Sequence, residues 1–412
     1  MKRKRKQKRK RGRNVPEKVL VLASVASMID QFNLPNIKLL QEMGYEVHVA
    51  CNFKNGNTCD TAQVLSLSKR LRRMHVALHQ WDCPRSVCSV KKCWIAYRQI
   101  RRLLRRTPFA WMHCQSPVGG ALARIAAHQA GLPVIYTAHG FHFYKGAPFW
   151  NWLLYYPVEK LLARWTDQLV TVNREDYCFA ARHLKAGKID RIPGVGIDTA
   201  YFENLRRGCG LQSARRAFCK KYRIPEDACV LLSVGELSRR KNHKAVISAL
   251  ARIRQDHVYY IICGQGPYRK TLMRYARRLG VSKRVRLIGF QKDVGELYQN
   301  ADVFVFPSRQ EGMPVALMEA MAAGMACIVS DVRGNRELIG TFFGDNAQPC
   351  FGGIRVSVHR PKQMRQAVRY LSANPQIWQL CGMFNQEKIQ DYDIAVVQKR
   401  MRRIYDGMEK YE

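Results

Sequence analysis

Hydrophobic residues follow two alternating patterns along the chain. Short runs rich in β-branched residues, such as residues 18–23 (KVLVLA) and 46–50 (EVHVA), are typical of buried strands. Longer stretches between them have helical periodicity, for example residues 90–106, which end before Pro108. Strands that alternate with helices of about 10 to 15 residues indicate parallel sheets built from β-α-β units.

The same two patterns predict further elements in both halves of the chain. In the first half, strands are predicted at residues 110–113, 133–137 and 168–172, and helices at 34–43, 117–129 and 148–165. In the second half, strands are predicted at 229–234, 258–263, 285–288, 302–306 and 326–330, and helices at 242–254, 268–279, 314–323 and within 362–412. The apolar run 19–29 is interpreted as a strand and the loop that follows it. These elements predict an α/β fold with two doubly wound, Rossmann-like units.

The periodicity is lost over residues 203–214, where we expect the junction of the two units. The expected organisation is a basic arm (1–14), an amino-terminal Rossmann-like domain (15–203), a linker (204–214), a carboxyl-terminal Rossmann-like domain (215–385) and a final helix (386–412) that packs back on the first domain. Doubly wound sheets bind ligands at the carboxyl ends of their strands, so two facing units would enclose a site between them.

Composition narrows the choice of partner. Hydrophobic residues make up 47% of the 412 residues, which excludes a disordered chain, and Lys+Arg exceed Asp+Glu by 70 to 31, a net charge of +39. Ten of the twelve residues 2–13 are Lys or Arg. Such charge favours an anionic membrane surface, nucleic acid or a phosphorylated substrate as partner. No motif of an RNA-binding fold accompanies the arm, so nucleic acid is not the expected partner.

No segment is expected to cross or direct the chain across a membrane. The longest apolar run has 11 residues, fewer than the roughly 18 that a membrane span requires. The basic amino terminus lacks the features of a secretory signal, and the 14 cysteines are interpreted as thiols in a reducing cytoplasm. Three of them, Cys83, Cys88 and Cys93, lack the C-x2-C pair usual in metal sites, so no metal is expected.

The segment 302–323 (DVFVFPSRQEGMPVALMEAMAA) is the most informative for chemistry. A strand is followed by a polar loop and then by a helix near Pro314, whose free N–H groups would attract phosphate. Glu319 lies among apolar residues of this helix, and a ribose diol would supply donors to its carboxylate. Glu311, in the loop, could face the group that the phosphate carries. An ion pair with a neighbouring arginine is an equally open interpretation of these acids.

Three other strand ends contribute candidates. Arg239, Arg240 and Lys241 follow the strand 229–234, where a diphosphate would lie, although a solvated basic turn would have the same sequence. Gly264 and Gly266 follow the strand 258–263 and could mark only a tight turn. His139 follows the strand 133–137 and could bond a sugar hydroxyl or move a proton, or could be a histidine bonded to backbone.

An ordered series of motifs resembles the family 4 retaining glycosyltransferases, which have the GT-B fold of two facing Rossmann-like domains with a cleft between them. The series runs through GVGID (194–198), GEL and KNH (235–243), GQGP (264–267), GF with Asp293, and EGMPVALMEAMAAG followed by VSDVRGNRELI. The segments TAHGFHF and NWLLYYPVEKLLARWTD resemble the branch that makes capsular and exopolysaccharides in Gram-positive bacteria. The resemblance covers about residues 15 to 405.

The resemblance implies a cytoplasmic enzyme, peripheral at the membrane, that moves a sugar from a nucleotide sugar, UDP-linked by expectation, to a lipid-linked saccharide. Glu319 would bind the ribose, and Glu311 and His139 would be the catalytic residues on the sugar side. The remaining donor-binding residues would be Lys241, Arg239, Arg240, Gly264, Gly266, Gly289, Phe290, Gly312, Met313, Val315 and Ala316. No cofactor is implied.

The sequence departs from the family at two places and leaves three alternatives open. Glu236 stands where many members have a phosphate-binding arginine, and residues 24–28 (SVASM) replace a Gly-Gly loop on the acceptor side. Phe149 and Trp150 begin an aromatic-rich stretch, and either could touch lipid or belong to a core helix. The other functions considered are a GT-B-like sugar-nucleotide epimerase and a basic RNA-binding protein with a degenerate enzyme fold.

Overall fold

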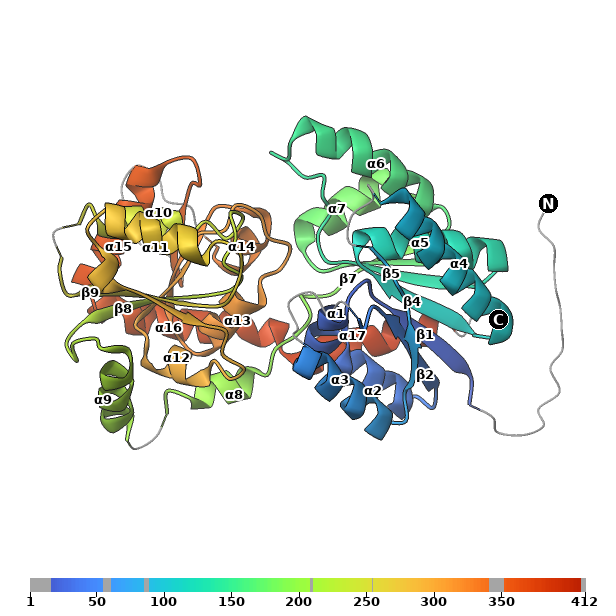
Figure 1. The fold of residues 1–412 in the computed structure, drawn as a ribbon, viewed down its shortest axis with the longest axis horizontal. Helices are drawn as coiled ribbons and strands as arrows, with labels where there is room; N and C mark the ends of the chain where they lie inside the picture. The colour runs from blue at the N-terminus through green and yellow to red at the C-terminus, as the bar shows by residue number, and fades with distance from the viewer. Residues whose placement is uncertain are drawn as a thin grey trace.

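A computed structural model describes residues 16–54, 61–84, 89–207, 210–253, 255–340 and 352–408. The described chain forms two α/β units, each built on one parallel sheet (Figure 1). The strand orders are β3-β2-β1-β4-β5-β6-β7 in the first sheet and β10-β9-β8-β11-β12-β13 in the second. In both sheets the order reverses beside the first strand of the unit, which is the doubly wound arrangement predicted from the sequence.

The first sheet consists of β1 (Lys18–Leu22), β2 (Glu46–Cys51), β3 (Ala77–Gln80), β4 (Trp111–Gln115), β5 (Val134–Ala138), β6 (Gln168–Thr171) and β7 (Lys188–Arg191). Its helices are α1 (Ala26–Phe32), α2 (Leu34–Glu42), α3 (Thr61–Arg73), α4 (Val90–Arg106), α5 (Pro117–Ala130), α6 (Phe149–Ala163) and α7 (Arg174–His183). Strands β1, β4 and β5 are buried almost throughout, which explains the apolar sequence of β1 and most of β5, whereas β4 (WMHCQ) also buries the polar His113 and Gln115.

The second sheet consists of β8 (Cys229–Val234), β9 (Val258–Cys263), β10 (Val285–Gly289), β11 (Val303–Phe306), β12 (Ala326–Ser330) and β13 (Gly353–Val356). Its helices are α8 (Thr199–Asn204), α9 (Leu211–Tyr222), α10 (Lys244–Leu250), α11 (Arg269–Arg278), α12 (Gly295–Asn300), α13 (Val315–Ala322), α14 (Arg333–Leu338), α15 (Pro361–Ala373) and α16 (Gln376–Ile389). The stretch predicted as a linker contains the end of α8 and the start of α9.

The end of the chain returns to the first unit. After α16, Ile197 and Asp393 form an isolated parallel bridge, and helix α17 (Ile394–Asp406) then lies against the first sheet (Figure 1). The Tyr405 ring stacks on Trp111 with a centroid distance of 5.4 Å, and its hydroxyl lies 3.1 Å from Nδ1 of His113. The last helix therefore belongs to the core of the first unit.

Three local predictions are wrong. The loop expected after β1 is instead the short helix α1, which buries Ala26, Ser27 and Ile29; its few residues are too short a window for helical periodicity to appear. The helix expected from residue 242 begins only at Lys244, and Asn242 does not cap it. Asn242 has a positive φ of 56°, and its side-chain amide donates to the Pro307 carbonyl at 3.2 Å.

Helices α3, α7, α8, α9, α12 and α14 and strands β3, β7 and β13 were also not predicted. Helix α3 ends in Arg-rich sequence and buries only Val64, Leu67 and Leu71, and no residue of β3 is buried, so both elements gave a weak signal. The predicted basic arm at residues 1–14 lies outside the described residues, as does Cys88. Within the part that is described, no helix has the length and apolar character needed to span a membrane.

Candidate active site

A cavity of about 400 Å³ lies between the two units, at the carboxyl ends of their strands. One wall comes from α1 and the loops after β5, β6 and β7, and the other from the loops after β8 and β11 and the start of α14. Its lining residues are Met28, Phe32, His139, Gly140, His142, Val172, Val195, Arg240, Gln310, Glu311, Gly312, Met313 and Arg333. Five of the residues singled out from the sequence therefore meet in one cavity: His139, Arg240, Glu311, Gly312 and Met313.

Glu311 is held by two cations. The loop after β11 places its Oε1 atom 2.8 Å from Nζ of Lys241 and 2.9 Å from Nη1 of Arg240, both from the loop after β8. Burial would raise the pKa of the Glu311 carboxyl, but the charges of Lys241 and Arg240 outweigh it and hold the pKa below its ordinary value. The carboxylate is therefore ionised, and it serves as the counterion of the cations in the absence of a ligand.

Lys241 is positioned by more than this ion pair. Its side chain is only 12% exposed, and its ammonium lies 4.4 Å from the centroid of the Phe306 ring at the end of β11. Burial lowers the pKa of Lys241, an effect that the Glu311 charge opposes. A buried cation with one carboxylate partner at a strand end is suited to bind a second anion such as a diphosphate.

Glu319 has a different environment. On α13 it accepts a hydrogen bond of 2.9 Å from the Tyr298 hydroxyl, and among the described residues it has no Lys or Arg at ion-pair distance. Burial raises the pKa of Glu319 to about 7, against which the Tyr298 bond acts only weakly. The ion-pair interpretation of Glu319 thus has no partner in the described chain, and a carboxylate so placed is short of donors.

The raised pKa of this partly buried acid should make stability depend on pH. The folded protein keeps the Glu319 proton up to about pH 7, whereas the unfolded chain releases it near 4.5, so the free energy of unfolding should fall as pH rises between these values. The difference in unfolding free energy between Glu319→Gln and wild type, measured by urea denaturation without ligand, should grow in favour of the variant over that window. A difference that stays constant with pH would contradict the buried-acid assignment.

His139 forms part of a polar network across the first sheet. Its Nε2 atom lies 2.6 Å from Oε1 of Gln115, whose amide group in turn donates to Asn33. Burial lowers the pKa of His139 to about 4, so the ring is neutral near pH 7. Because Gln115 Oε1 can only accept, Nε2 carries the proton and Nδ1 is left as an acceptor, suited to a sugar hydroxyl.

Arg333 connects the two walls of the cavity, and the sequence analysis missed it. Its guanidinium donates to the backbone carbonyl of Glu311 at 3.1 Å and to that of Phe141 at 3.0 Å, and it pairs with Asp176 of α7 at 2.5 Å. Gly140 leaves room for this, because a Cβ there would lie 2.9 Å from the guanidinium. Arg333 lies in the VSDVRGNRELI segment that the family resemblance singled out. Nothing in the spacing of that segment predicted a partner for Arg333 in the other unit.

A second contact between the units lies beside this one. Glu337 of α14 accepts a hydrogen bond from the Arg174 amide at 2.6 Å and pairs with Arg191 at 3.1 Å. Figure 1 shows α14 on the edge of its unit that faces α7. Together with the Arg333–Asp176 pair, this contact fixes how the two halves of the cavity face each other.

The other donor-binding candidates do not line the cavity. Gly264 and Gly266 allow the loops after β8 and β9 to pack closely, since a Cβ on Gly266 would lie 2.5 Å from the Leu237 carbonyl. Arg239 and Phe290 are exposed, Phe290 by 49%, and Gly289 ends strand β10 with a φ of 79°. Val315 and Ala316 form the first turn of α13, as predicted, and Lys241 and Glu319 are not among the residues that line the cavity.

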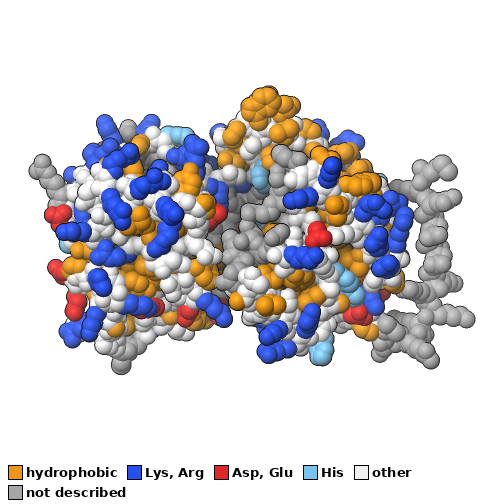
Figure 2. Space-filling view, viewed as in Figure 1, with side chains coloured by type: hydrophobic (Ala, Val, Ile, Leu, Met, Phe, Trp, Pro, Cys, Tyr) orange, Lys and Arg blue, Asp and Glu red, His pale blue; other side chains and the backbone are white. Residues whose placement is uncertain are grey.

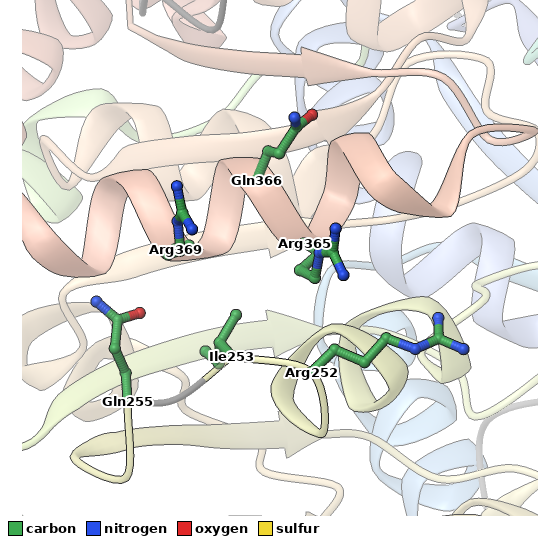
Figure 3. Close-up of a pocket in the computed structure, with 6 residues that line it drawn as sticks. All are labelled: Arg252, Ile253, Gln255, Arg365, Gln366 and Arg369. Atoms are coloured by element: carbon green, nitrogen blue, oxygen red, sulfur yellow. The ribbon is translucent and has the colours of Figure 1, made fainter.

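Two further features bear on ligands. Another cavity, of about 420 Å³, lies between the segment that follows α10 and helix α15 and shares no residue with the interdomain cavity. Figure 3 shows its lining residues, Arg252, Ile253, Gln255, Arg365, Gln366 and Arg369. Within the described ranges, no three His, Cys, Asp or Glu side chains gather as a metal site would require. The expectation of a metal-independent site stays a prediction.

Comparison with known proteins gives consistent results for both units. The family profile "Glycosyl transferases group 1" matches residues 214–389, and "Glycosyl transferase 4-like domain" matches residues 35–194. The chain is 34% identical to EpsD of Bacillus subtilis (strain 168), named as a glycosyltransferase, over 95% of this chain and 97% of EpsD. It is 31% identical to the Escherichia coli UDP-Gal:alpha-D-GlcNAc-diphosphoundecaprenol alpha-1,3-galactosyltransferase, over 58% of this chain and 62% of that protein.

Solved structures share the fold at low sequence identity. Anabaena Alr3699/HepE in complex with UDP superposes with a TM-score of 0.72 at 16% identity, covering 95% of this chain and 100% of that one. Sucrose-phosphate synthase from Thermosynechococcus elongatus superposes with a TM-score of 0.75 at 16% identity, covering 96% and 100%. The two-unit architecture of this chain is therefore the one found in these two solved structures.

Proposed function

The chain belongs to the group 1 glycosyl transferases and is a glycosyltransferase of GT-B fold, and we propose that its donor is a UDP-sugar and its acceptor a lipid-linked saccharide. The proposal places the reaction in exopolysaccharide or capsule synthesis, with the stereochemistry of the sugar retained. It also places the enzyme in the cytoplasm, peripheral at the inner face of the membrane.

The relatives support the choice of donor and acceptor. The name of the Escherichia coli relative gives UDP-Gal as donor and a diphosphoundecaprenol-linked sugar as acceptor, and a Campylobacter jejuni relative at 27% identity is named for a diphospho-undecaprenol acceptor as well. A solved neighbour was crystallised with UDP-glucose. Because these proteins are named for, or crystallised with, UDP-sugars or undecaprenol-linked acceptors, the same classes of donor and acceptor are favoured for this chain.

The observation that carries the proposal is the Glu311–Lys241–Arg240 ion pair at the cavity wall. A departing UDP bears its developing charge on the diphosphate, and Lys241, Arg240 and the amide groups at the start of α13 would stabilise that charge as preorganised donors. Arg239 lies on the same loop and could add a third positive charge. This is electrostatic catalysis that needs no metal ion.

Glu319, Glu311 and His139 would each contact a different part of the substrates. Glu319 would accept the ribose hydroxyls, which supply the donors that its environment lacks. Glu311, in the cavity wall beyond the diphosphate, would hold the sugar in its reacting geometry. The neutral His139 would accept a hydroxyl hydrogen from the sugar or the acceptor on the opposite wall.

Nucleotide binding tests the part given to Glu319. Replacing Glu319 by Ala should weaken binding of UDP by about 1.5–3 kcal/mol, the usual contribution of hydrogen bonds to a charged group. Calorimetric titration with UDP measures this, and the exposed Glu296→Ala of α12 is the matched control, expected to bind as wild type does. Unchanged affinity in folded Glu319→Ala would assign the residue to structure alone.

Two alternatives predict different outcomes. A sugar-nucleotide epimerase of this fold would convert the UDP-sugar without any acceptor, and would leave the sugar on the nucleotide. An RNA-binding protein would shift RNA in a salt-dependent manner that survives loss of Glu311. The match of both units to glycosyl transferase family profiles, and to relatives named as glycosyltransferases, favours sugar transfer.

A further inference from the structure

Helix α6 presents an apolar face to solvent. Phe149 and Trp150 at its start are 72% and 66% exposed, and the same face continues through Leu153, Leu154, Val158 and Leu161, each about half exposed or more. Figure 2 shows these hydrophobic side chains gathered on the part of the first unit where α6 lies. We call these six residues the α6 ridge. A helix that is apolar on all sides is normally buried on all sides, so an unpartnered outer face requires an explanation.

The inner face of α6 is held by a buried ion pair. Glu159 binds Arg124 of α5 in a bidentate manner, with distances of 2.6 and 3.0 Å, and the guanidinium lies 3.8 Å from the centroid of the Tyr136 ring. Arg124 is fully buried. Breaking such a pair is costly, because it leaves an unpaired charge inside the protein. The Arg124–Glu159 pair therefore fixes the orientation of α6 about its own axis, so that the ridge faces solvent in the folded protein.

The surface beside the ridge is mainly positive, although α7, which packs on α6 through Phe179, carries Glu175, whose side chain is 37% exposed and pairs with Arg336. Helix α4, which packs on α5 next to α6, contains seven exposed Lys and Arg residues and no acid: Lys91, Lys92, Arg98, Arg101, Arg102, Arg105 and Arg106. Helix α5 has no acid either, and the single acid of α6 is the buried Glu159. Trp94 of α4 is itself 58% exposed.

We propose that the α6 ridge inserts into the headgroup region of an anionic lipid bilayer, with the basic side chains of α4 on the lipid phosphates. Aromatic and aliphatic side chains flanked by Lys and Arg are the composition that partitions into this interface. A second copy of the chain fits less well, because its own ridge would bring the same excess of positive charge. Charge complementarity thus selects the bilayer as the occupant.

The ridge adjoins the interdomain cavity, which gives the insertion a consequence for the acceptor. The Asn151 amide of α6 donates to the His142 carbonyl at 2.9 Å, and the rings of His142 and Tyr155 lie 4.7 Å apart. His142 lines the cavity. Resting on the proposed function, this contact implies that a lipid-linked acceptor reaches the cavity at the start of α6 while its lipid stays in the bilayer.

Vesicle binding tests the ridge without depending on catalysis. The test variant carries Phe149→Ser, Trp150→Ser and Leu154→Ser, and the matched control carries Leu380→Ser and Met383→Ser on α16, which are 70% and 63% exposed in the other unit. Co-sedimentation with phosphatidylglycerol vesicles should fall about tenfold or more for the test variant and stay at the wild-type value for the control. Both variants keep the basic amino terminus, so its charge cannot account for a difference.

The outcomes separate the ridge from the proposed function. The inference is overturned if the test variant binds vesicles as the control does, or if wild type binds phosphatidylcholine vesicles equally well, or if the test variant changes a dimer into a monomer on gel filtration. Normal circular dichroism and UDP affinity show that the variant is folded. If vesicle binding falls as expected while neither wild type nor control transfers any sugar, the ridge stands and the proposed function fails.

Discussion

Replacement of Glu311 by Gln is expected to lower the turnover of sugar transfer on the order of a hundredfold or more, comparable to the loss of one well-placed electrostatic contact. The variant keeps the size of the side chain and part of its hydrogen bonding but loses its charge. A residue that holds the sugar in its reacting geometry matters more in the transition state than in the ground state, so the loss should fall on kcat.

The structure adds an expectation for nucleotide binding in the same variant. The Glu311 carboxylate neutralises Lys241 and Arg240 at 2.8 and 2.9 Å, so a diphosphate has to share these cations with it. Without that charge the cations are freer to bind an anion, and UDP should bind at least as tightly as to wild type. Measuring kcat and UDP affinity on one preparation tests both parts.

A matched control lies on the surface of the second unit. Glu226 is 63% exposed and pairs with Arg216 at 3.4 Å, so Glu226→Gln removes a paired carboxylate away from the cavity. It should leave turnover close to wild type. If the Glu311→Gln variant also transfers sugar at the wild-type rate, the catalytic role of Glu311 is refuted. If the variant loses most of its affinity for UDP, Glu311 belongs to the nucleotide subsite.

Replacement of Arg333 by Ala should destabilise the protein by about 3–5 kcal/mol and abolish most sugar transfer. The guanidinium and the Asp176 carboxylate are each only 3% exposed, and removing one partner of so buried a pair leaves the other charge unpaired. The variant also loses the bonds to the Glu311 and Phe141 carbonyls, which hold the two walls of the cavity together.

Arg336, one turn along the same helix, provides the control. It is 41% exposed and pairs with Asp331 and Glu175 at the surface, so Arg336→Ala should cost about 0–1 kcal/mol. Urea denaturation compares the two variants, and a double variant with Asp176→Asn should recover part of the stability lost in Arg333→Ala. Equal destabilisation by the two arginine variants would mean that the buried pair does not join the units.

The sequence allowed the frame of the fold to be predicted because most strands are buried on both faces. The limits of β8, β9 and β12 agree with the predicted runs residue for residue, and the predicted helix at residues 90–106 is α4. The order of the motifs along the chain identified the two loops that carry Lys241 and Glu311, which lie in contact in the structure. These features depend on local sequence and on the order of elements.

Features that depend on contacts between distant segments could not be predicted. Arg333 and Asp176 are 157 residues apart, and neither stood out, because a single charged residue in a basic chain gives no signal of its partner. The orientation of α6 depends on the burial of Glu159 against Arg124, which an apolar helix sequence does not reveal. The left-handed conformation of Asn242 likewise follows from its bond to the Pro307 carbonyl on a neighbouring loop.

Acceptor-dependent release of UDP is the decisive measurement for the proposed function. Purified protein is incubated with a panel of labelled UDP-sugars and a lipid-linked saccharide, and both UDP and lipid-associated label are followed, with the anomeric configuration of the product read by NMR. One UDP-sugar should release UDP only when the acceptor is present, and its label should enter the lipid fraction with its anomeric configuration retained. Label that stays on the nucleotide as an epimer, or UDP-sugars left unconsumed beside every acceptor tried, would contradict transfer in the Glu311–His139 cavity.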